Sequence, residues 1–382
     1  MSYKKFKARQ LFTGTTMLGD DFVLITEKDG CIEAIVKTEE AGDDVQQLNG
    51  ILSPGFINTH CHLELSHMKG LIAEHTGLVD FVLQVVTQRH FPEDEILTAI
   101  EKAETDMLAA GIVAVGDICN NTLTLPQKKL NRLHYHNFIE VSGWNPLIAD
   151  IRMERSLEHY QTFQQAFSKH SSLSPHAPYS VSPELWALMQ PYFIEQVITI
   201  HNQESEAENE LFQNGTGDFI RLYETMHITN PSFKAPGTNS LPAYFHQMQK
   251  GKHVILVHNS FTSQNDIDLV LQTNTPVSFC LCPNANLYIE NTLPPVDLLL
   301  QNKLNICIGT DSLASNHQLS VWEEIKTLQL HFPHLSLAVL LQAATLNGAR
   351  ALGMDDVLGS FEKGKKPGVI VLENTTNITR LI

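Results

Sequence analysis

Between Ser53 and Leu352, short apolar runs of strand length alternate with longer stretches of helical character. This alternation is typical of βαβ units, in which helices connect parallel strands. The strand-like runs number eight in about 300 residues, which is the count and size expected of a (β/α)8 barrel. They lie at residues 56–59, 112–117, 136–141, 172–174, 197–201, 254–258, 277–281 and 305–309.

The two ends of the chain have a different pattern. The first 52 residues contain short β-like runs such as Asp21 to Thr26, separated by Gly and Asp turns and without a helical period. The final stretch returns to β character with the apolar run Val369 to Leu372. We therefore predict an α/β chain with a (β/α)8 TIM barrel over residues 54–354. A small β-sandwich domain is expected from both chain ends, residues 1–53 plus 355–382.

The charge balance excludes several classes of function. The chain has 42 acidic and 26 basic residues, so its formal net charge is −16. A surface of this sign repels phosphate groups and anionic membranes, and we expect neither nucleic acid nor a membrane as a partner. No apolar window approaches the length of a membrane span, and the polar start of the chain does not resemble a signal peptide. We expect a cytoplasmic protein whose six cysteines are buried thiols rather than disulfides.

Side chains that commonly bind metal ions follow four of the predicted strands. His60 and His62 follow the first strand, and alternate residues of an extended segment point to the same side. His201 and His258 each end an apolar run, and Asp311 follows the last strand. Barrel active sites are built at the carboxyl ends of the strands, so we expect these side chains to meet. Together they form a ligand set for catalytic zinc or iron, although each histidine alone could equally be a hydrogen-bonded structural residue.

Five segments carry these residues: Pro54 to His62, His201 to Glu204, Val257 to Ser260, Cys282 to Asn286 and Gly309 to Ser312. Together they resemble the amidohydrolase superfamily, within its cytosine/adenosine deaminase and chlorohydrolase branch. The resemblance covers essentially the whole chain, although Pro367 and Gly368 stand where Ala-Asp is usual in the family. Within the branch, Leu63 to Ser66 and Gly309 to Asn316 are most similar to the aminodeoxyfutalosine deaminases.

The resemblance implies roles for the site residues. One divalent metal ion, zinc or alternatively ferrous iron, would be bound by His60, His62, His201 and Asp311. A single ion is expected because the fourth predicted strand has no lysine that could bridge two. Such an ion turns water into a hydroxide nucleophile near neutral pH. Asp311 would accept the proton, His258 would orient the hydroxide, and Glu204 would transfer a proton to the substrate. Without its position after His201, Glu204 would be interpreted as a solvated glutamate in the first turn of a helix, since Glu206, Glu208 and Glu210 follow.

Substrate contacts are expected in the loops that follow the strands. By the resemblance, His176 lies over the substrate. Glu64 could meet a polar edge of the substrate or form a salt bridge to a lid residue. Arg221 could clamp a substrate anion, and Ser315 and Asn316 could line the pocket.

These observations predict a metal-dependent aminohydrolase that releases ammonia from an amino-substituted heterocycle, purine or nucleoside-like, such as aminodeoxyfutalosine. One alternative is a hydrolase of another C–N bond or a C–Cl bond, of the pterin, guanine or triazine type, with the same metal site. Another is a non-enzymatic barrel without its metal, which the complete set of ligand residues argues against. The expected partner is a small heterocyclic molecule, and a second copy of the chain in a homodimer is an open alternative.

Overall fold

The computed structural model describes residues 3–373 and 377–382. Eight strands between Phe56 and Ile308 form two four-stranded sheets, in the orders β11-β10-β9-β8 and β12-β13-β14-β15, and every neighbouring pair is parallel. Each of the eight runs predicted from the sequence coincides with one of these strands. The strands are β8 (Phe56–Cys61), β9 (Ile112–Cys119), β10 (His134–Val141), β11 (Ser171–Pro175), β12 (Val197–Asn202), β13 (His253–His258), β14 (Val277–Leu281) and β15 (Asn305–Ile308).

The two parallel sheets meet at both edges. On one side, an isolated parallel bridge pairs Cys61 at the end of β8 with Asp311 beyond β15. On the other side, the backbone N–H of His201 on β12 donates to the carbonyl of His176, just after β11, at 2.9 Å. The carboxyl ends of the eight strands therefore face the same end of this assembly.

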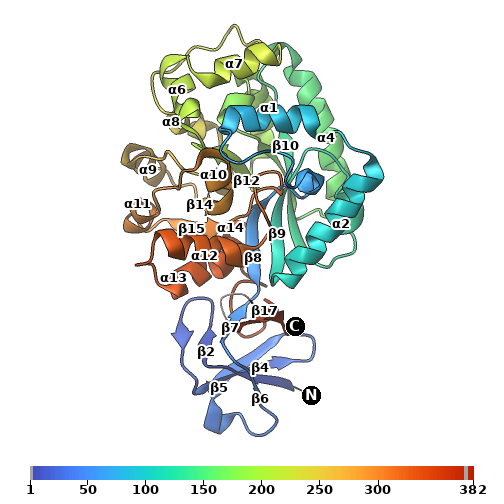
Figure 1. The fold of residues 1–382 in the computed structure, drawn as a ribbon, viewed down its shortest axis with the longest axis vertical. Helices are drawn as coiled ribbons and strands as arrows, with labels where there is room; N and C mark the ends of the chain where they lie inside the picture. Colours follow the sequence, from blue (N-terminus) through green and yellow to red (C-terminus); the bar gives the residue numbers. More distant parts are fainter. Residues whose placement is uncertain (1–2, 374–376) are drawn as a thin grey trace.

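Helices connect the strands and surround the sheets in Figure 1. Three of them, α1, α6 and α7, lie together at one end of the molecule, and both chain termini lie toward the other end (Figure 1). The helices are α1 (Leu78–Gln88), α2 (Glu93–Ala109), α3 (Leu125–Lys128), α4 (Ala149–Ala166), α5 (Pro183–Met189), α6 (Glu206–Asn214), α7 (Asp218–Thr225), α8 (Ser240–Tyr244), α9 (Gln264–Leu271), α10 (Pro283–Glu290), α11 (Val296–Gln301), α12 (Val321–His331), α13 (Leu337–Gln342) and α14 (Gly348–Ala351).

Local sequence signals explain where several helices begin and end. Ser182, Ser263 and Ser320 stand before α5, α9 and α12, and each side chain accepts a hydrogen bond from a backbone N–H of the first turn. Gly215 ends α6 with φ of 69°, a left-handed conformation that glycine adopts without strain. α6 follows β12, the strand that carries His201, after a connection of three residues.

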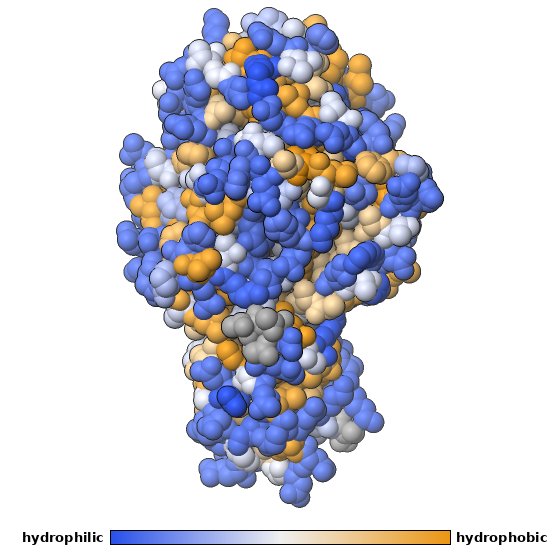
Figure 2. Space-filling model, in the orientation of Figure 1, coloured by the Kyte–Doolittle hydropathy of each residue, from blue (hydrophilic) through white to orange (hydrophobic). Residues whose placement is uncertain are grey.

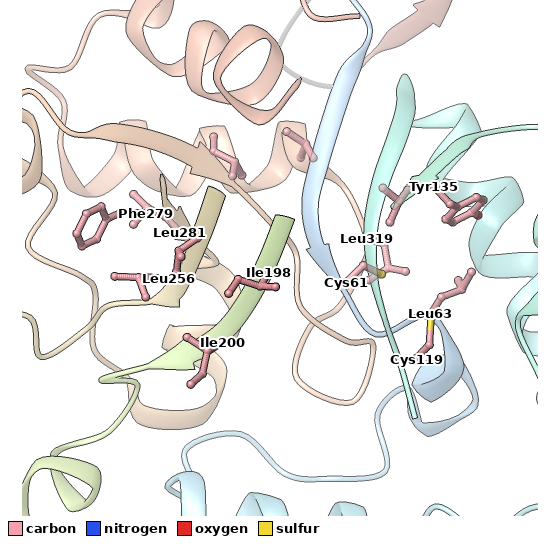
Figure 3. Packing of buried hydrophobic residues seen from close by; sticks show 14 of the residues in the cluster. Cys61, Leu63, Cys119, Tyr135, Ile198, Ile200, Leu256, Phe279, Leu281 and Leu319 are labelled. Atoms are coloured by element: carbon pink, nitrogen blue, oxygen red, sulfur yellow. The ribbon is translucent and has the colours of Figure 1, made fainter. Parts of the chain in front are cut away.

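The strands are buried on both faces, and successive residues pack into different clusters. On β13, Leu256 packs in the large cluster that includes helix residues, whereas Ile255 and Val257 pack in a second cluster with Cys280. Figure 3 shows Leu256 beside Ile200 and other members of the large cluster. This double burial makes the strands a rigid support for the side chains at their ends.

Two further sheets are present. The sheet in the order β5-β4-β1-β6 contains N-terminal strands alone, and the sheet in the order β17-β16-β7-β2-β3 combines strands from both ends of the chain. Antiparallel pairing of β16 with β7 joins the final stretch to the N-terminal segment, as the sequence predicts. Figure 2 shows a mostly hydrophilic face that narrows toward this part of the molecule. In the described residues, no helix is both long and apolar enough to span a bilayer. The strands are β1 (Tyr3–Lys7), β2 (Gln10–Phe12), β3 (Met17–Leu18), β4 (Phe22–Glu27), β5 (Ile32–Lys37), β6 (Gln46–Gln47), β7 (Ile51–Pro54), β16 (Val369–Leu372) and β17 (Ile378–Arg380).

Candidate metal centre and active site

Five ligand-type side chains meet at the carboxyl ends of the parallel strands, as the sequence predicts. The Nε2 atoms of His60 and His62 each lie 3.3 Å from Asp311 Oδ1. His258 Nε2 lies 3.0 Å from His201 Nδ1. In two groups, His60 with His201 and His258, and His60 with His62 and Asp311, the candidate ligand atoms all lie within 4.8 Å of one another. We refer to these five residues as the ligand cluster.

The ligand cluster fits a divalent cation. Both ring nitrogens of His60 and the Nε2 atom of His201 are buried and make no hydrogen bond within the described part of the chain, which is rare for polar atoms unless another group binds them. Burial is the main cause that lowers the pKa of His60 and of His62 to about 3, so both imidazoles are neutral at pH 7. The pKa of Asp311 lies well below its usual range, because the nearby histidines outweigh the effect of burial. Neutral imidazoles with a carboxylate are the donor set of catalytic zinc sites.

The backbone at the strand ends is held in an uncommon conformation. His258 and Asp311 have φ angles of 74° and 57°, in the left-handed region that residues other than glycine seldom occupy. Asn58 holds the turn before Asp311, because its amide exchanges two hydrogen bonds with Thr310, at 2.8 and 3.1 Å. Such strain persists only where the surrounding structure enforces it, and it is concentrated at functional sites.

A second set of buried polar side chains, distinct from the ligand cluster, supports the turn that carries His62. Asp117 Oδ1 accepts a hydrogen bond from the backbone N–H of Leu63 at 2.8 Å. Its other oxygen lies 2.5 Å from Lys128 Nζ, and both side chains are fully buried. Lys128 also donates to Asn137 Oδ1 at 2.8 Å and to Cys119 Sγ at 3.1 Å. Figure 3 shows Cys119 close to Leu63. We call Asp117, Lys128, Asn137 and Cys119 the support cluster.

Glu204 lies beside the ligand cluster. Its carboxylate oxygens are 3.6 Å from His201 Nδ1 and 3.5 Å from His258 Nε2. The residue precedes α6 and is 3% exposed, so the alternative of a solvated helix glutamate does not apply. Burial raises the pKa of Glu204 above the usual value for glutamate. A carboxyl group with a raised pKa is suited to both give and take a proton near neutral pH.

His176 lies between the ligand cluster and a buried glutamate. Its ring centroid is 4.6 Å from that of His201, and its Nδ1 atom is 3.1 Å from Glu140 Oε2. Although burial alone would raise the pKa of Glu140, the adjacent His176 outweighs burial and lowers that pKa, so Glu140 is ionised. The side chain of His176 is 24% exposed, more than any histidine of the ligand cluster. It can therefore meet a bound molecule.

Ser315 and Asn316 are buried and hold the segment that follows β15. Ser315 Oγ donates to Asp311 Oδ2 at 2.5 Å. Asn316 Nδ2 donates to the carbonyl of Thr310 at 2.9 Å and to Glu324 Oε1 at 2.8 Å. Ser315 therefore orients Asp311, and Asn316 holds the backbone just before it; their contact with substrate stays a prediction.

Glu64 and Arg221, the other two predicted substrate contacts, have protein partners. Glu64 is buried, which raises its pKa to about 7, and its Oε1 atom pairs with Arg89 Nη2 at 2.9 Å. Glu64 therefore forms a salt bridge, whereas a lid role for its partner and a contact of Glu64 with substrate stay predictions. Arg221 on α7 is half exposed and pairs with Asp80 of α1 at 2.7 Å and with Asp218 at 2.8 Å. It makes no described hydrogen bond or ion pair with the ligand cluster, so its anion-binding role is without support here.

An apolar layer formed by loops and helices lies beside the site. Tyr179 follows His176, and its ring stacks on Phe219 of α7 with centroids 4.0 Å apart. Tyr223 donates its hydroxyl hydrogen to the carbonyl of Tyr179 at 2.6 Å. The same cluster includes Leu65 from the segment after His62. Apolar walls with a few convergent polar groups are typical of sites for small ligands.

Sequence reasoning missed Asp117, Lys128 and Glu140. A usable signal exists for two of them, because Asp117 ends the predicted strand 112–117 and Glu140 is the penultimate residue of the predicted strand 136–141. Both are carboxylates at the strand ends where barrel sites are built. Lys128 lies in the short helix α3, and no local pattern indicates that its side chain is buried.

Comparison with known proteins gives one consistent result. Residues 51–382 match the model of the amidohydrolase family. An adenosine deaminase of Helicobacter pylori is 26% identical, over 87% of this chain and 81% of that protein. An aminodeoxyfutalosine deaminase of Nitratiruptor sp. is 24% identical, over 97% of this chain and 91% of that protein. The crystal structure of an aminofutalosine deaminase of Helicobacter pylori with methylthio-coformycin has a TM-score of 0.81 at 21% identity, covering 98% of this chain and 93% of that one, and this identity supports the fold alone.

Proposed function

The chain belongs to the amidohydrolase family, and we propose that it is a metal-dependent deaminase of adenine-type nucleosides. The observation that carries this proposal is the position of Glu204, whose carboxylate lies within 3.6 Å of two histidines of the ligand cluster. Deamination requires proton transfer next to the attacked carbon, and Glu204, a buried acid with a raised pKa beside the ligand cluster, is proposed to perform it. The relatives with similar sequences include deaminases that act on adenosine and aminodeoxyfutalosine.

The proposed ligands of the metal ion are His60, His62, His201 and Asp311. One divalent ion is proposed, zinc before ferrous iron, because imidazole and carboxylate donors suit both. When bound, such an ion lowers the pKa of water and so supplies a nucleophile near neutral pH. The unpartnered ring nitrogens of His60 and His201 support this assignment.

The protein's own groups are proposed to move the protons. Protonated Glu204 donates to the ring nitrogen beside the carbon that carries the amine, which allows that carbon to be attacked. Asp311 takes up the proton that the water loses, with Ser315 bound to its second oxygen. The amine takes that proton from Asp311, the C–N bond breaks with its electron pair on nitrogen, and ammonia leaves. The new hydroxyl gives its proton to Glu204 as the C=O bond forms, and the ring nitrogen keeps its hydrogen. His258 packs against His201 and is proposed to orient the nucleophile.

Residues beside the ligand cluster are proposed to bind the heterocycle of the substrate. His176 and the apolar layer around Tyr179 flank the ligand cluster and are proposed to contact the heterocycle. A planar purine suits a wall of apolar and aromatic groups with few polar atoms. Among adenine-type substrates, we rank aminodeoxyfutalosine first, because Leu63 to Ser66 and Gly309 to Asn316 resemble the enzymes that use it.

We further propose that the two parallel sheets close into one (β/α)8 barrel over residues 54–354. The bridge from Cys61 to Asp311 and the hydrogen bond from His201 to His176 support closure at the two seams. A separate small β-sandwich of residues 1–53 plus 355–382 is proposed as well. Its support is the antiparallel pairing of β7 with β16.

An ammonia-release screen tests the proposed function. The zinc-loaded protein is assayed with adenosine, 5′-deoxyadenosine, 5′-methylthioadenosine, aminodeoxyfutalosine, guanine, a pterin and a chlorinated triazine at equal concentration. We expect ammonia from the adenine nucleosides, with aminodeoxyfutalosine fastest. Activity confined to guanine or pterin would refute the substrate class. Chloride release without ammonia would refute deamination itself.

A further inference from the structure

A row of polar contacts runs across the carboxyl ends of β8, β9, β10 and β11, and it begins at Arg89, which follows α1. Arg89 Nη2 donates to Glu64 Oε1 at 2.9 Å, and Glu64 Oε2 accepts from the backbone N–H of Asn120 at 3.0 Å. The side chain of Asn120 donates to Glu140 Oε1 at 2.7 Å. Glu140 Oε2 then meets His176 Nδ1 at 3.1 Å. The row therefore ends at the one histidine that is proposed to touch the substrate.

Glu140 has a donor on each oxygen. An ionised carboxylate can only accept hydrogen bonds, so Nδ1 of His176 must be the donor in their contact. Asn120 holds the other oxygen, so the carboxylate cannot rotate without breaking that bond. The side chain of Glu140 is only 10% exposed, which makes an unpaired position costly.

His176 is constrained at its backbone as well as at Nδ1. Its N–H donates to the carbonyl of Val141 at 3.1 Å, and its carbonyl accepts from His201 at 2.9 Å. Its Nε2 atom makes no hydrogen bond to any residue that the structure describes. With Nδ1 bound to Glu140, Nε2 is the ring nitrogen left for a ligand.

We propose that Glu140 is a positioning residue that fixes the ring orientation and the Nδ1–H form of His176, so that Nε2 meets the heterocycle. The identity of that ligand rests on the proposed function, whereas the contact between Glu140 and His176 does not. Glu64 then serves to anchor Asn120 and Arg89, since each of its oxygens already accepts a hydrogen bond. In this proposal, the row of Glu64, Asn120, Glu140 and His176 forms one side of the site.

A double-mutant cycle distinguishes positioning from general structural support. Glu140→Gln keeps the size of the side chain, but its amide can accept from only one of the two donors. We expect kcat/KM for 5′-deoxyadenosine to fall roughly 10- to 100-fold, with zinc content and Tm close to wild type. In a His176→Ala background, Glu140→Gln should add less than about a threefold loss, because residues that act through one another are not additive. Equal losses in both backgrounds would overturn the proposal.

Glu104→Gln is the matched control for a buried glutamate. Glu104 is fully buried and accepts a hydrogen bond from Tyr135 at 2.9 Å, but it has no contact with His176. We expect its kcat/KM to stay within about threefold of wild type. A loss equal to that of Glu140→Gln would mean that any buried amide disturbs the site, and this would also overturn the proposal.

The ring itself can be observed without any turnover. In long-range ¹H–¹⁵N spectra of the zinc-loaded protein, the His176 signals are assigned by their loss in His176→Ala. We expect Nδ1 to carry hydrogen in the wild type and the nitrogen pattern to change in Glu140→Gln. An unprotonated Nδ1, or an unchanged pattern in the variant, would refute the proposal. If the wild type releases no ammonia from any compound of the screen, the proposed function fails and these spectra still decide the role of Glu140.

Discussion

The ligand cluster and the support cluster both contact the turn at His62, and both bury charged or titratable groups. In the support cluster, Lys128 has three polar partners, and each oxygen of Asp117 is bound. In the ligand cluster, three ring nitrogens of His60 and His201 make no hydrogen bond to any described residue. A buried group that is fully paired stabilises the fold around it, whereas unpaired donors at one point are suited to bind something else. This difference distinguishes the candidate functional site from its scaffold.

The largest expected effect comes from removing a metal ligand. His201→Ala should lose the bound zinc and all measurable ammonia release while the fold is kept, because the strand below is held by apolar packing. Zinc content by atomic emission, with circular dichroism for the fold, checks this. The matched control is His253→Ala. His253 is the first residue of β13, at the end of that strand away from His258 and the ligand cluster, so this variant should keep one zinc ion and its activity. A His201→Ala protein with zinc and normal turnover would refute the ligand assignment.

The next largest effect is expected from Glu204→Gln, which keeps the shape of the side chain and removes its exchangeable proton. We expect kcat to fall by roughly 10² to 10⁴ with zinc retained, as is typical for loss of a general acid–base group. Steady-state kinetics on 5′-deoxyadenosine measure this. Glu206→Gln, an exposed neighbour in the first turn of α6, is the control and should be unchanged. A loss below about threefold would make Glu204 a structural residue.

Breaking the support cluster should act first on stability. Lys128→Met leaves Asp117 charged and unpaired, and removal of one partner of a buried pair costs about 3–5 kcal/mol in the free energy of unfolding. Urea denaturation measures this loss, and Lys129→Met on the exposed side is the control. The double variant with Asp117→Asn should recover part of the stability, because no charge is then left unpaired. If Lys128→Met is as stable as wild type, the support cluster has no such role.

Glu208 resembles the support cluster in one carboxylate oxygen, which is hydrogen-bonded, and the ligand cluster in the other, which is not. Its raised pKa predicts that the stability of the fold depends on pH. One oxygen accepts from the backbone of Gln203 at 2.9 Å and from the hydroxyl of Ser240, and the other makes no hydrogen bond to a described residue. Burial raises the pKa of Glu208 to about 7. A raised carboxyl pKa means that the folded state binds the proton more tightly, so stability falls as pH rises from about 4.5 to 7. Glu208→Gln should remove up to about 3 kcal/mol of that fall. Equal pH profiles of Tm in wild type and variant would contradict this, with exposed Glu210→Gln as the control.

The smallest effect is expected at Arg221, which bridges α1 and α7 through exposed ion pairs. Such pairs contribute at most about 1 kcal/mol, so Arg221→Ala should change Tm little. We expect its KM for 5′-deoxyadenosine to stay within about twofold of wild type. A rise in KM above roughly tenfold would restore the predicted role of Arg221 as an anion clamp.

The two clusters also differ in how far a sequence can predict them. His60, His201 and Asp311 lie at the carboxyl ends of apolar runs. Parallel strands bring their carboxyl ends together independently of the conformations of the connecting loops. The pairing of Asp117 with Lys128 depends on where a short helix packs, which no local pattern encodes. Arg221 illustrates the same limit, because its partner Asp80 lies 141 residues away. Strand ends could therefore be predicted from the sequence, and the partners of loop and helix residues could not.

The central claim is that the ligand cluster binds one metal ion on which deamination depends. The most direct test is to remove the metal from the protein with a chelator and then to titrate zinc back. Bound zinc and ammonia release from 5′-deoxyadenosine are measured in the same samples. The account predicts that both rise together and reach their plateau at one equivalent of zinc per chain. Full ammonia release without zinc, or a plateau at two equivalents, would contradict it.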